Sequence, residues 1–108
     1  MSLINIQKQM RKGVIELCVL TVLKKKEAYP SEIIEALKVY NFHLLEGTLY
    51  PLLTRLKKYG WIDYRWEESE IGPPRKYFAI TNLGEKFYRE IKNSWKELSS
   101  SVDSILNN

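Results

Sequence analysis

The residues from 46 to 60, EGTLYPLLTRLKKYG, combine a buried stripe with polar and basic side chains at regular spacing. Leucines at i, i+3, i+4 and i+7 predict a helix with one apolar face. At about 100° per residue, the opposite face presents small, hydroxyl-bearing, aromatic and basic groups. These are Gly47, Thr48, Tyr50, Pro51, Thr54, Arg55, Lys57 and Lys58. No carboxylate follows Glu46 on that face, so its chemistry suits contact with phosphates and base edges.

Pro51 and Gly47 are poor helix formers, and both fall in the opening turns of this helix. Small, compact groups there allow a helix start to press close to a groove, where free N–H groups and the helix dipole favour phosphate. Thr54 and Arg55 are then placed to read base edges or phosphate, with Arg55 the better partner for guanine. A plain solvated helix face remains the alternative reading.

A second pair of cations lies in GPPRKYF, where Arg75 and Lys76 begin a short aromatic strand. Prolines before them predict a stiffened turn, so the tip of a hairpin would carry both cations into a nucleic-acid backbone with little ordering cost. The competing interpretation is a neutral hairpin, because three glutamates lie on the facing segment. These are Glu67, Glu68 and Glu70.

Catalytic and metal chemistry find no support in the residue pattern. We identify no Ser/His/Asp or Cys/His arrangement and no phosphate-binding glycine loop, which argues against an enzyme or a cofactor. His43 is the only histidine and has no ligand-type residues at metal-binding spacing, so no metal site is expected. Cys18, the only cysteine, reads as a small core residue of a protein from a reducing compartment.

Length and charge set further bounds. A chain of 108 residues has enough length for one modest core, and its net charge of +4 with a pI near 9.2 permits a polyanionic partner without demanding one. Neither a long apolar run nor a signal-peptide pattern occurs, so we expect a cytoplasmic protein that does not enter a membrane.

The elements that must position the cations can be read from periodicity. A first helix is expected over 5–26, apolar all round from Val14 to Leu23, and a second begins at Pro30 or Ser31. A connection over 39–45 leads to the helix described above, which Gly60 ends. Alternation then predicts a strand over 62–67, a loop through ESEIGPP, and a strand over 75–80.

Thr81 predicts the N-cap of a last helix over 82–106. Its apolar residues are spaced by three and four, which is typical of a coiled-coil seam and indicates a homodimer. They are Tyr88, Ile91, Trp95, Leu98, Val102 and Ile105. The first helix also indicates a homodimer, because so small a chain can hardly cover all of its apolar surface by itself.

Three helices, a hairpin and a long helix give a mainly α protein with the element order of a winged helix-turn-helix. In that fold the third helix enters the major groove of DNA, and the hairpin, or wing, reaches a neighbouring backbone or minor groove. We therefore expect a DNA-binding domain over 1–81 and a dimerisation helix over 82–108, packed as one unit. The alternative is a winged-helix module that binds protein and leaves DNA untouched.

The motifs GTLYPLLTRL at 47–56, KKYGWI at 57–62, GPPRKYFAIT at 72–81 and the glycine of TNLGE resemble the PadR family of bacterial transcriptional regulators, in its short subgroup. The resemblance covers almost the whole chain. It implies a dimeric repressor of its own or a neighbouring transporter or detoxification gene, bound to a palindromic operator in double-stranded DNA. The departures are Leu45 where the family often has a serine or asparagine cap, and Pro30 and Ser31 where a glycine and an aromatic are common.

The resemblance also implies roles for single residues. Thr48, Tyr50 and Arg55 would face DNA, Arg75 and Lys76 would lie on the wing, and Tyr29 would lie near a phosphate. Family members that sense drugs stack planar ligands on aromatic residues of the last helix, which implies a small aromatic effector at Trp95. Simple interface packing is the alternative role for that side chain.

Overall fold

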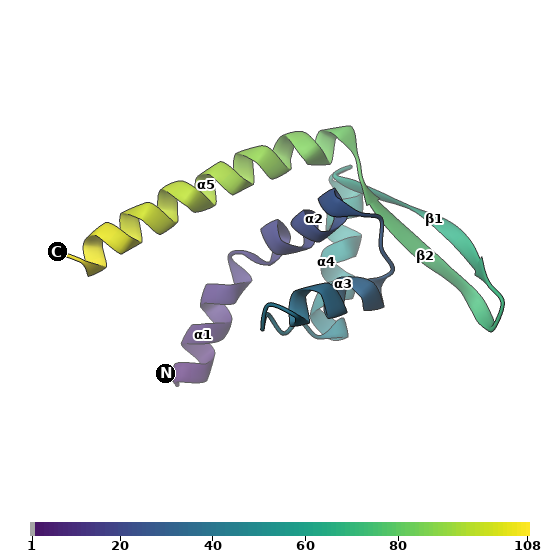
Figure 1. The fold of residues 1–108 in the computed structure, drawn as a ribbon, viewed down its shortest axis with the longest axis horizontal. Helices are drawn as coiled ribbons and strands as arrows, with labels where there is room; N and C mark the ends of the chain where they lie inside the picture. The colour runs from purple at the N-terminus through teal and green to yellow at the C-terminus, as the bar shows by residue number, and fades with distance from the viewer. Residues whose placement is uncertain (1) are drawn as a thin grey trace.

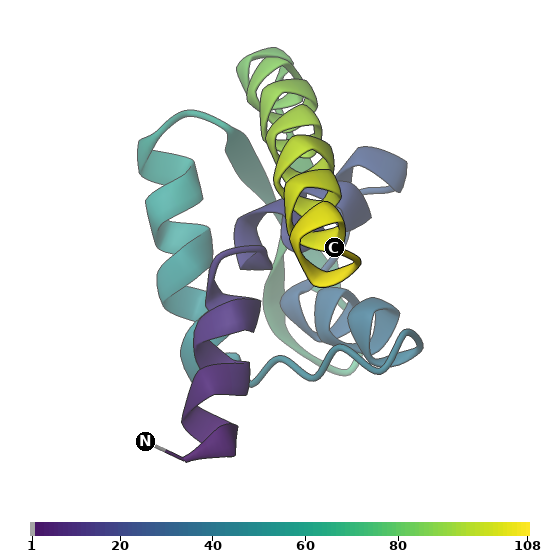
Figure 2. The same ribbon diagram turned by 90° about the vertical axis from the view of Figure 1, so that its left-hand side faces the viewer.

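The computed structural model describes residues 2–108, which form five helices and one two-stranded sheet (Figure 1). In chain order these are α1 (Leu3–Lys12), α2 (Ile15–Lys25), α3 (Pro30–Lys38), α4 (Glu46–Lys58), β1 (Ile62–Ser69), β2 (Gly72–Ile80) and α5 (Asn82–Leu106). The radius of gyration is 15.6 Å, against about 13 Å for a compact domain of this length. The excess arises because α1, the hairpin and the far half of α5 extend from a small centre (Figures 1 and 2).

The single first helix expected over 5–26 is wrong, because the chain bends between α1 and α2. Gly13 caps α1, and Val14 has a non-helical backbone with φ −121° and ψ 3°. Glycine followed by β-branched residues weakens a helix at this point. No described residue of α1 is buried, whereas Val19, Leu20 and Leu23 of α2 enter the core.

The core lies where α2, α3 and α4 meet the base of the hairpin. The four leucines of α4 are buried, as their spacing predicts, and Ile33 of α3 and Ile62 of β1 pack with them. Pro51 is exposed on the outer side of α4, where it cannot donate to the carbonyl of Gly47. Burial of the leucine face therefore holds this helix in spite of its weak opening turns.

The hairpin is longer than the sequence predicts, and its turn is elsewhere. β1 and β2 pair antiparallel from Ile62 opposite Ile80 to Ser69 opposite Gly72, so the turn lies at Glu70 and Ile71. The expected loop through GPP is wrong, since Pro73 and Pro74 belong to β2. They are tolerated because both strands are edge strands and the register shifts between Glu67 and Ser69.

A tight junction joins the end of α4, the base of the hairpin and the start of α5. The Thr81 hydroxyl donates to the Gly60 carbonyl at 2.6 Å and accepts from the Gly84 N–H at 3.0 Å. The Thr81 N–H donates to the Trp61 carbonyl at 3.0 Å. The expected Thr81 cap is thus confirmed, and Gly60, with φ +77°, supplies the left-handed turn that follows α4.

The two halves of α5 have different surroundings. Tyr88 is 9% exposed and Ile91 is partly buried against the core, so their own chain covers the first of these seam residues and part of the second. This corrects the expectation that all six seam residues face a second copy. Trp95, Leu98, Val102 and Ile105 remain exposed. In residues 2–108, no helix combines the length and the apolar character needed to cross a bilayer.

We predict that Gly84→Ala strongly destabilises the fold. A Cβ at this position would collide with the backbone carbonyl of Trp61 and lie 2.8 Å from a side-chain carbon of Ile80. Backbone cannot move aside cheaply, so the free energy of unfolding should fall by about 3 kcal/mol. Chemical denaturation followed by circular dichroism measures the change.

Gly47→Ala is the matched control, because no atom lies within 4 Å of a Cβ there. It should leave the free energy of unfolding unchanged or raise it by up to about 1 kcal/mol. Equal stabilities for the two variants would contradict the steric role assigned to Gly84.

Candidate nucleic-acid interface

A groove of about 670 Å³ lies between α4, the start of α3 and the hairpin. Its walls carry four cations, several aromatic rings and no carboxylate. The lining residues are Tyr29, Pro30, Ser31, Tyr50, Leu53, Thr54, Lys57, Lys58, Tyr64, Trp66, Pro74, Arg75, Lys76 and Phe78. A hollow that is positive and free of acids suits a polyanion such as a nucleic-acid backbone.

Part of the outer face of α4 forms one wall of this groove. Tyr50, Thr54 and Lys58 line it, and the Thr54 hydroxyl donates to the Tyr50 carbonyl at 3.1 Å. Lys57 also lines it, with its ammonium 3.5 Å from the Asp63 carboxylate. Hydrogen bonding from the Tyr64 N–H, together with the charge of Lys57, lowers the pKa of Asp63 below its usual value.

Arg55 lies away from the groove, on the flank of α4 that faces α2. Its guanidinium is 3.8 Å from the Glu16 carboxylate, and it does not line the groove. Gly47, Thr48 and Pro51 are exposed but also lie outside the groove lining. The predicted outer face is therefore solvent-exposed as a whole, yet its residues divide between the groove and the side that faces α2.

The start of α3 forms a second wall. Tyr29, Pro30 and Ser31 lie here, and the Glu32 carboxylate accepts from the Tyr29 N–H at 2.9 Å. Burial and the nearby Glu67 raise the pKa of Tyr29. A tyrosine hydroxyl is protonated at neutral pH even at its ordinary pKa of about 10, so Tyr29 can donate to a phosphate oxygen.

The wing forms the third wall, and its cations lie over aromatic rings. The Lys76 ammonium is 4.4 Å from the Tyr64 ring centroid and 5.5 Å from that of Trp66. The Arg75 guanidinium is 5.3 Å from the Tyr29 centroid. In the described part of the chain, neither cation has a carboxylate within 4.0 Å, so neither forms an ion pair there.

The position of these two cations differs from the sequence prediction. Arg75 and Lys76 lie inside β2, whereas Glu70 and Ile71 occupy the turn. The wing therefore presents its cations from the middle of the strand, beside α3 and α4, instead of from a rigid tip. Glu67 lies opposite Arg75 in register, but its carboxylate is taken by Arg65.

Sequence reasoning missed Tyr64, Trp66 and Ser31 as groove residues and treated Lys57 only as a flank. Strand alternation predicts that Tyr64 and Trp66 lie on one face of the hairpin. It does not predict that they pair with Phe78 and Lys76, since this register depends on where the turn lies. The contribution of Ser31 follows from the packing of α3 beside the hairpin.

Residues 19–90, from α2 into α5, match the transcriptional regulator PadR-like family. The chain belongs to this family. PadR-like proteins bind DNA and regulate transcription, so the chain is a DNA-binding regulator and not an enzyme. The expected winged helix-turn-helix with a long last helix is confirmed by the fold that it shares with solved PadR-like structures.

Solved PadR-like structures align over nearly the whole chain. A PadR-like transcription factor from Bacteroides fragilis is 50% identical with a TM-score of 0.79, covering 94% of this chain and 98% of that one. A PadR-like regulator from Bacillus cereus is 38% identical with a TM-score of 0.82, covering 93% of this chain and 98% of that one.

Among protein sequences, an uncharacterized protein of Lysinibacillus sphaericus is 28% identical over 88% of this chain and 90% of its own length.

Proposed function

We propose that this PadR-like chain is a homodimeric repressor that acts in the cytoplasm on its own or a neighbouring transporter or detoxification gene. The observation that carries the DNA-binding part is the acid-free groove with Lys57, Lys58, Arg75 and Lys76 on its walls. A backbone in this groove would be held by the wing, the start of α3 and α4 together. Binding of duplex DNA is therefore expected to depend steeply on salt.

In this arrangement the first turns of α4 enter the major groove. Gly47, Thr48 and Pro51 allow a close approach, while Tyr50, Thr54 and Lys58 lie between the bases and the backbone. Arg55 reads base edges only if it leaves Glu16, and their 3.8 Å contact at the surface is weak enough to exchange. The Tyr29 hydroxyl donates to a phosphate at the start of α3.

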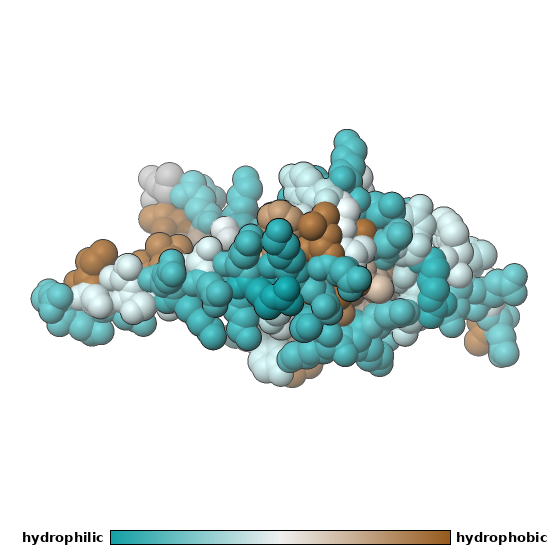
Figure 3. All heavy atoms as spheres, turned by 90° about the horizontal axis from the view of Figure 1, so that it is seen from above, coloured by the Kyte–Doolittle hydropathy of each residue, from teal (hydrophilic) through white to brown (hydrophobic). Residues whose placement is uncertain are grey.

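A second copy of the chain is the partner that best suits the uncovered apolar residues. α1 exposes Leu3, Ile4 and Met10, and the far half of α5 exposes a stripe from Trp95 to Ile105. Apolar surface shows over the middle of the molecule and in smaller patches toward the end opposite the wing (Figure 3). Patches of this kind mark protein interfaces, and a two-fold dimer would present two α4 helices to a palindromic operator with half-sites about 34–36 Å apart.

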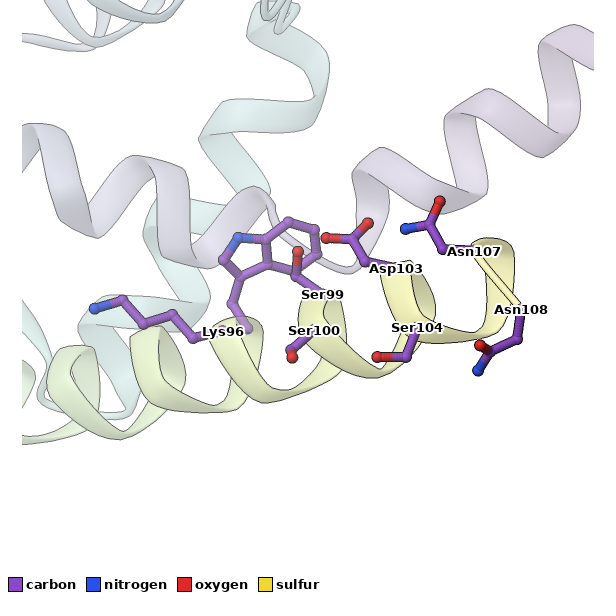
Figure 4. A pocket seen from close by; sticks show the side chains of 8 residues that line it. Lys96, Ser99, Ser100, Asp103, Ser104, Asn107 and Asn108 are labelled. Carbon is purple, nitrogen blue, oxygen red and sulfur yellow. The ribbon is translucent and has the colours of Figure 1, made fainter.

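The proposed effector site lies beside Trp95, whose side chain is 43% exposed. Polar residues along the rest of α5 and just after it line a shallow hollow with Trp95, namely Lys96, Ser99, Ser100, Asp103, Ser104, Asn107 and Asn108 (Figure 4). They all come from the C-terminal segment of one chain, so one chain forms only an open side of a site. Stacking of a planar aromatic molecule between the two Trp95 rings of a dimer would close it and relieve repression.

We predict that Arg75→Ala with Lys76→Ala weakens duplex binding whatever the DNA sequence. Loss of two phosphate contacts should lower the slope of log affinity against log salt by about 1.8. Fluorescence anisotropy with a labelled duplex of about 30 base pairs, three helical turns, measures it. Lys24→Ala with Lys86→Ala, an equal charge change away from the groove, is the control.

An unchanged slope in the wing variant would contradict the role given to Arg75 and Lys76. If the wild-type chain itself showed no salt-sensitive retention on duplex DNA, the winged-helix protein-interaction module would be favoured instead. A footprint on the intergenic DNA beside the gene tests the operator geometry, since two protected half-sites one helical turn apart are expected.

We predict that Leu98→Glu with Val102→Glu converts a dimer into a monomer. Two carboxylates in the apolar stripe would lose their hydration on association without gaining partners. Sedimentation equilibrium at micromolar concentration should give twice the mass of 12.8 kDa for the wild type and the single mass for the variant. Asn93→Glu with Ser100→Glu, on the opposite face of α5, should remain dimeric, and a wild-type monomer would overturn the proposal.

We predict that the planar dye proflavine quenches Trp95 and releases the operator. Trp95→Ala should weaken dye binding about tenfold because a stacking surface is lost. Anisotropy of the dye's own fluorescence measures the affinity, because Trp95→Ala lacks the quenched tryptophan, and Trp66→Phe, on the wing, should bind the dye like the wild type. Equal dye affinities for Trp95→Ala and the wild type would remove Trp95 from the effector site.

A further inference from the structure

The face of the hairpin opposite Lys76, which Arg75 shares, carries a network centred on Arg65. One terminal nitrogen of Arg65 lies 3.2 Å from a Glu67 oxygen, and the other lies 3.2 Å from a Glu27 oxygen. The guanidinium also lies 4.7 Å from the centroid of Tyr77, its cross-strand neighbour. Arg65 thereby joins β1 to β2 and to the connection between α2 and α3.

In this network Glu67 forms its ion pair with Arg65 and not with Arg75, its cross-strand neighbour. Glu67 and Arg75 are directly opposite across the two strands, and opposite charges at such positions normally attract. In the described chain they form no ion pair within 4.0 Å. Glu67 turns to Arg65 on its own strand, and Arg75 turns to the ring of Tyr29 at the wall of the groove.

We propose that Arg65 is a positioning residue for DNA binding, because it occupies the Glu67 carboxylate and so keeps the charge of Arg75 available to a phosphate. The inference rests on the proposed function of the groove. It assigns Arg65 a role without DNA contact: one cation on this face of the wing determines whether Arg75, on the same face and at the edge of the groove, is neutralised.

The geometry explains why Glu67 prefers Arg65 to Arg75. Arg65 uses its two terminal nitrogens on two carboxylates and its planar face on Tyr77, a combination that suits a guanidinium. Glu27, which belongs to another part of the chain, and Tyr77 hold Arg65 beside Glu67. Each surface pair is weak by itself, but a network that shares one cation holds its members in place more firmly than an isolated pair.

Removal of Arg65 has a defined consequence. In Arg65→Gln the guanidinium is lost, and Glu67 is left without a cation on its own strand. Its nearest cross-strand cation is Arg75. Pairing of these two would draw Arg75 away from Tyr29 and cancel one positive charge at the groove. The wing would then contribute one phosphate contact fewer.

The test measures the salt dependence of duplex binding by fluorescence anisotropy with a labelled mixed-sequence duplex of about 30 base pairs. Arg65→Gln should reduce the slope of log affinity against log salt by about 0.9. Between about 50 and 200 mM salt, the variant should therefore lose about 3.5-fold less affinity than the wild type. Melting curves establish that each variant is folded at the temperature of the assay.

A second substitution separates charge competition from a loosened wing. Arg65→Gln with Glu67→Gln should recover the wild-type slope, because no carboxylate remains opposite Arg75. Arg65→Gln with Glu68→Gln has the same net charge but keeps Glu67, so its slope should stay low. Glu67→Gln alone should match the wild-type slope, since Arg75 is already free there.

The outcomes are distinct. Recovery by Glu67→Gln and not by Glu68→Gln supports the inference. An unchanged slope in Arg65→Gln, or equal recovery by both glutamate variants, overturns it while the DNA-binding groove stands. A wild-type chain without salt-dependent duplex binding overturns the proposed function, and the role of Arg65 with it.

Discussion

The close approach of Gly84 to the Trp61 carbonyl is the constraint on which the remaining geometry depends, because only a hydrogen atom fits between them. Thr81 completes the junction by bonding to the Gly60 carbonyl and to the Gly84 N–H. The end of α4, the base of the hairpin and the start of α5 therefore meet at one place. The direction of the wing relative to α4 and the direction of α5 away from the core are both determined there.

The charge of the groove is kept available by what surrounds its cations. Lys76 and Arg75 lie over the rings of Tyr64, Trp66 and Tyr29, and in the described residues neither forms an ion pair with a carboxylate. An aromatic face holds a cation in position but leaves its full charge, whereas an ion pair would cancel it. The wing is thus ordered before DNA arrives without being neutralised, which lowers the conformational cost of binding.

Much of this architecture could be predicted from the sequence because local patterns dictate it. The leucine spacing of α4, the alternation of β1 and the Thr81 cap depend on neighbouring residues only. The features that were predicted wrongly depend on tertiary packing, which such local patterns do not contain. The bend at Gly13 and Val14 lies where a basic segment meets the apolar run that begins at Val14, and helical periodicity continues across it. The proline pair of β2 is allowed because it lies near the turn, beyond the bridge that Ala28 makes to Phe78.

In the candidate site, too, some features could be predicted from the sequence and others could not. An exposed, basic face on α4 follows from helix geometry, but the partners of its cations do not. Arg55 lies beside Glu16 and Lys57 beside Asp63, pairs that exist only after packing. Tyr88 and Ile91 fit the heptad spacing of a seam, yet α5 lies close enough to the core to cover them. A repeat of apolar residues predicts burial without saying which chain provides the cover.

Pro73 and Pro74 also affect how neighbouring molecules meet. Ala28 covers the outer edge of β2 at Phe78 through two backbone hydrogen bonds, but nearer the turn this edge is open, and unpaired N–H groups on an open edge can recruit a strand from another molecule. Consecutive strand residues direct their nitrogens to opposite sides, so one proline removes a donor from the outer edge of β2 and the other falls beside the register shift. The proline pair therefore lowers the tendency of two wings to join into one intermolecular sheet.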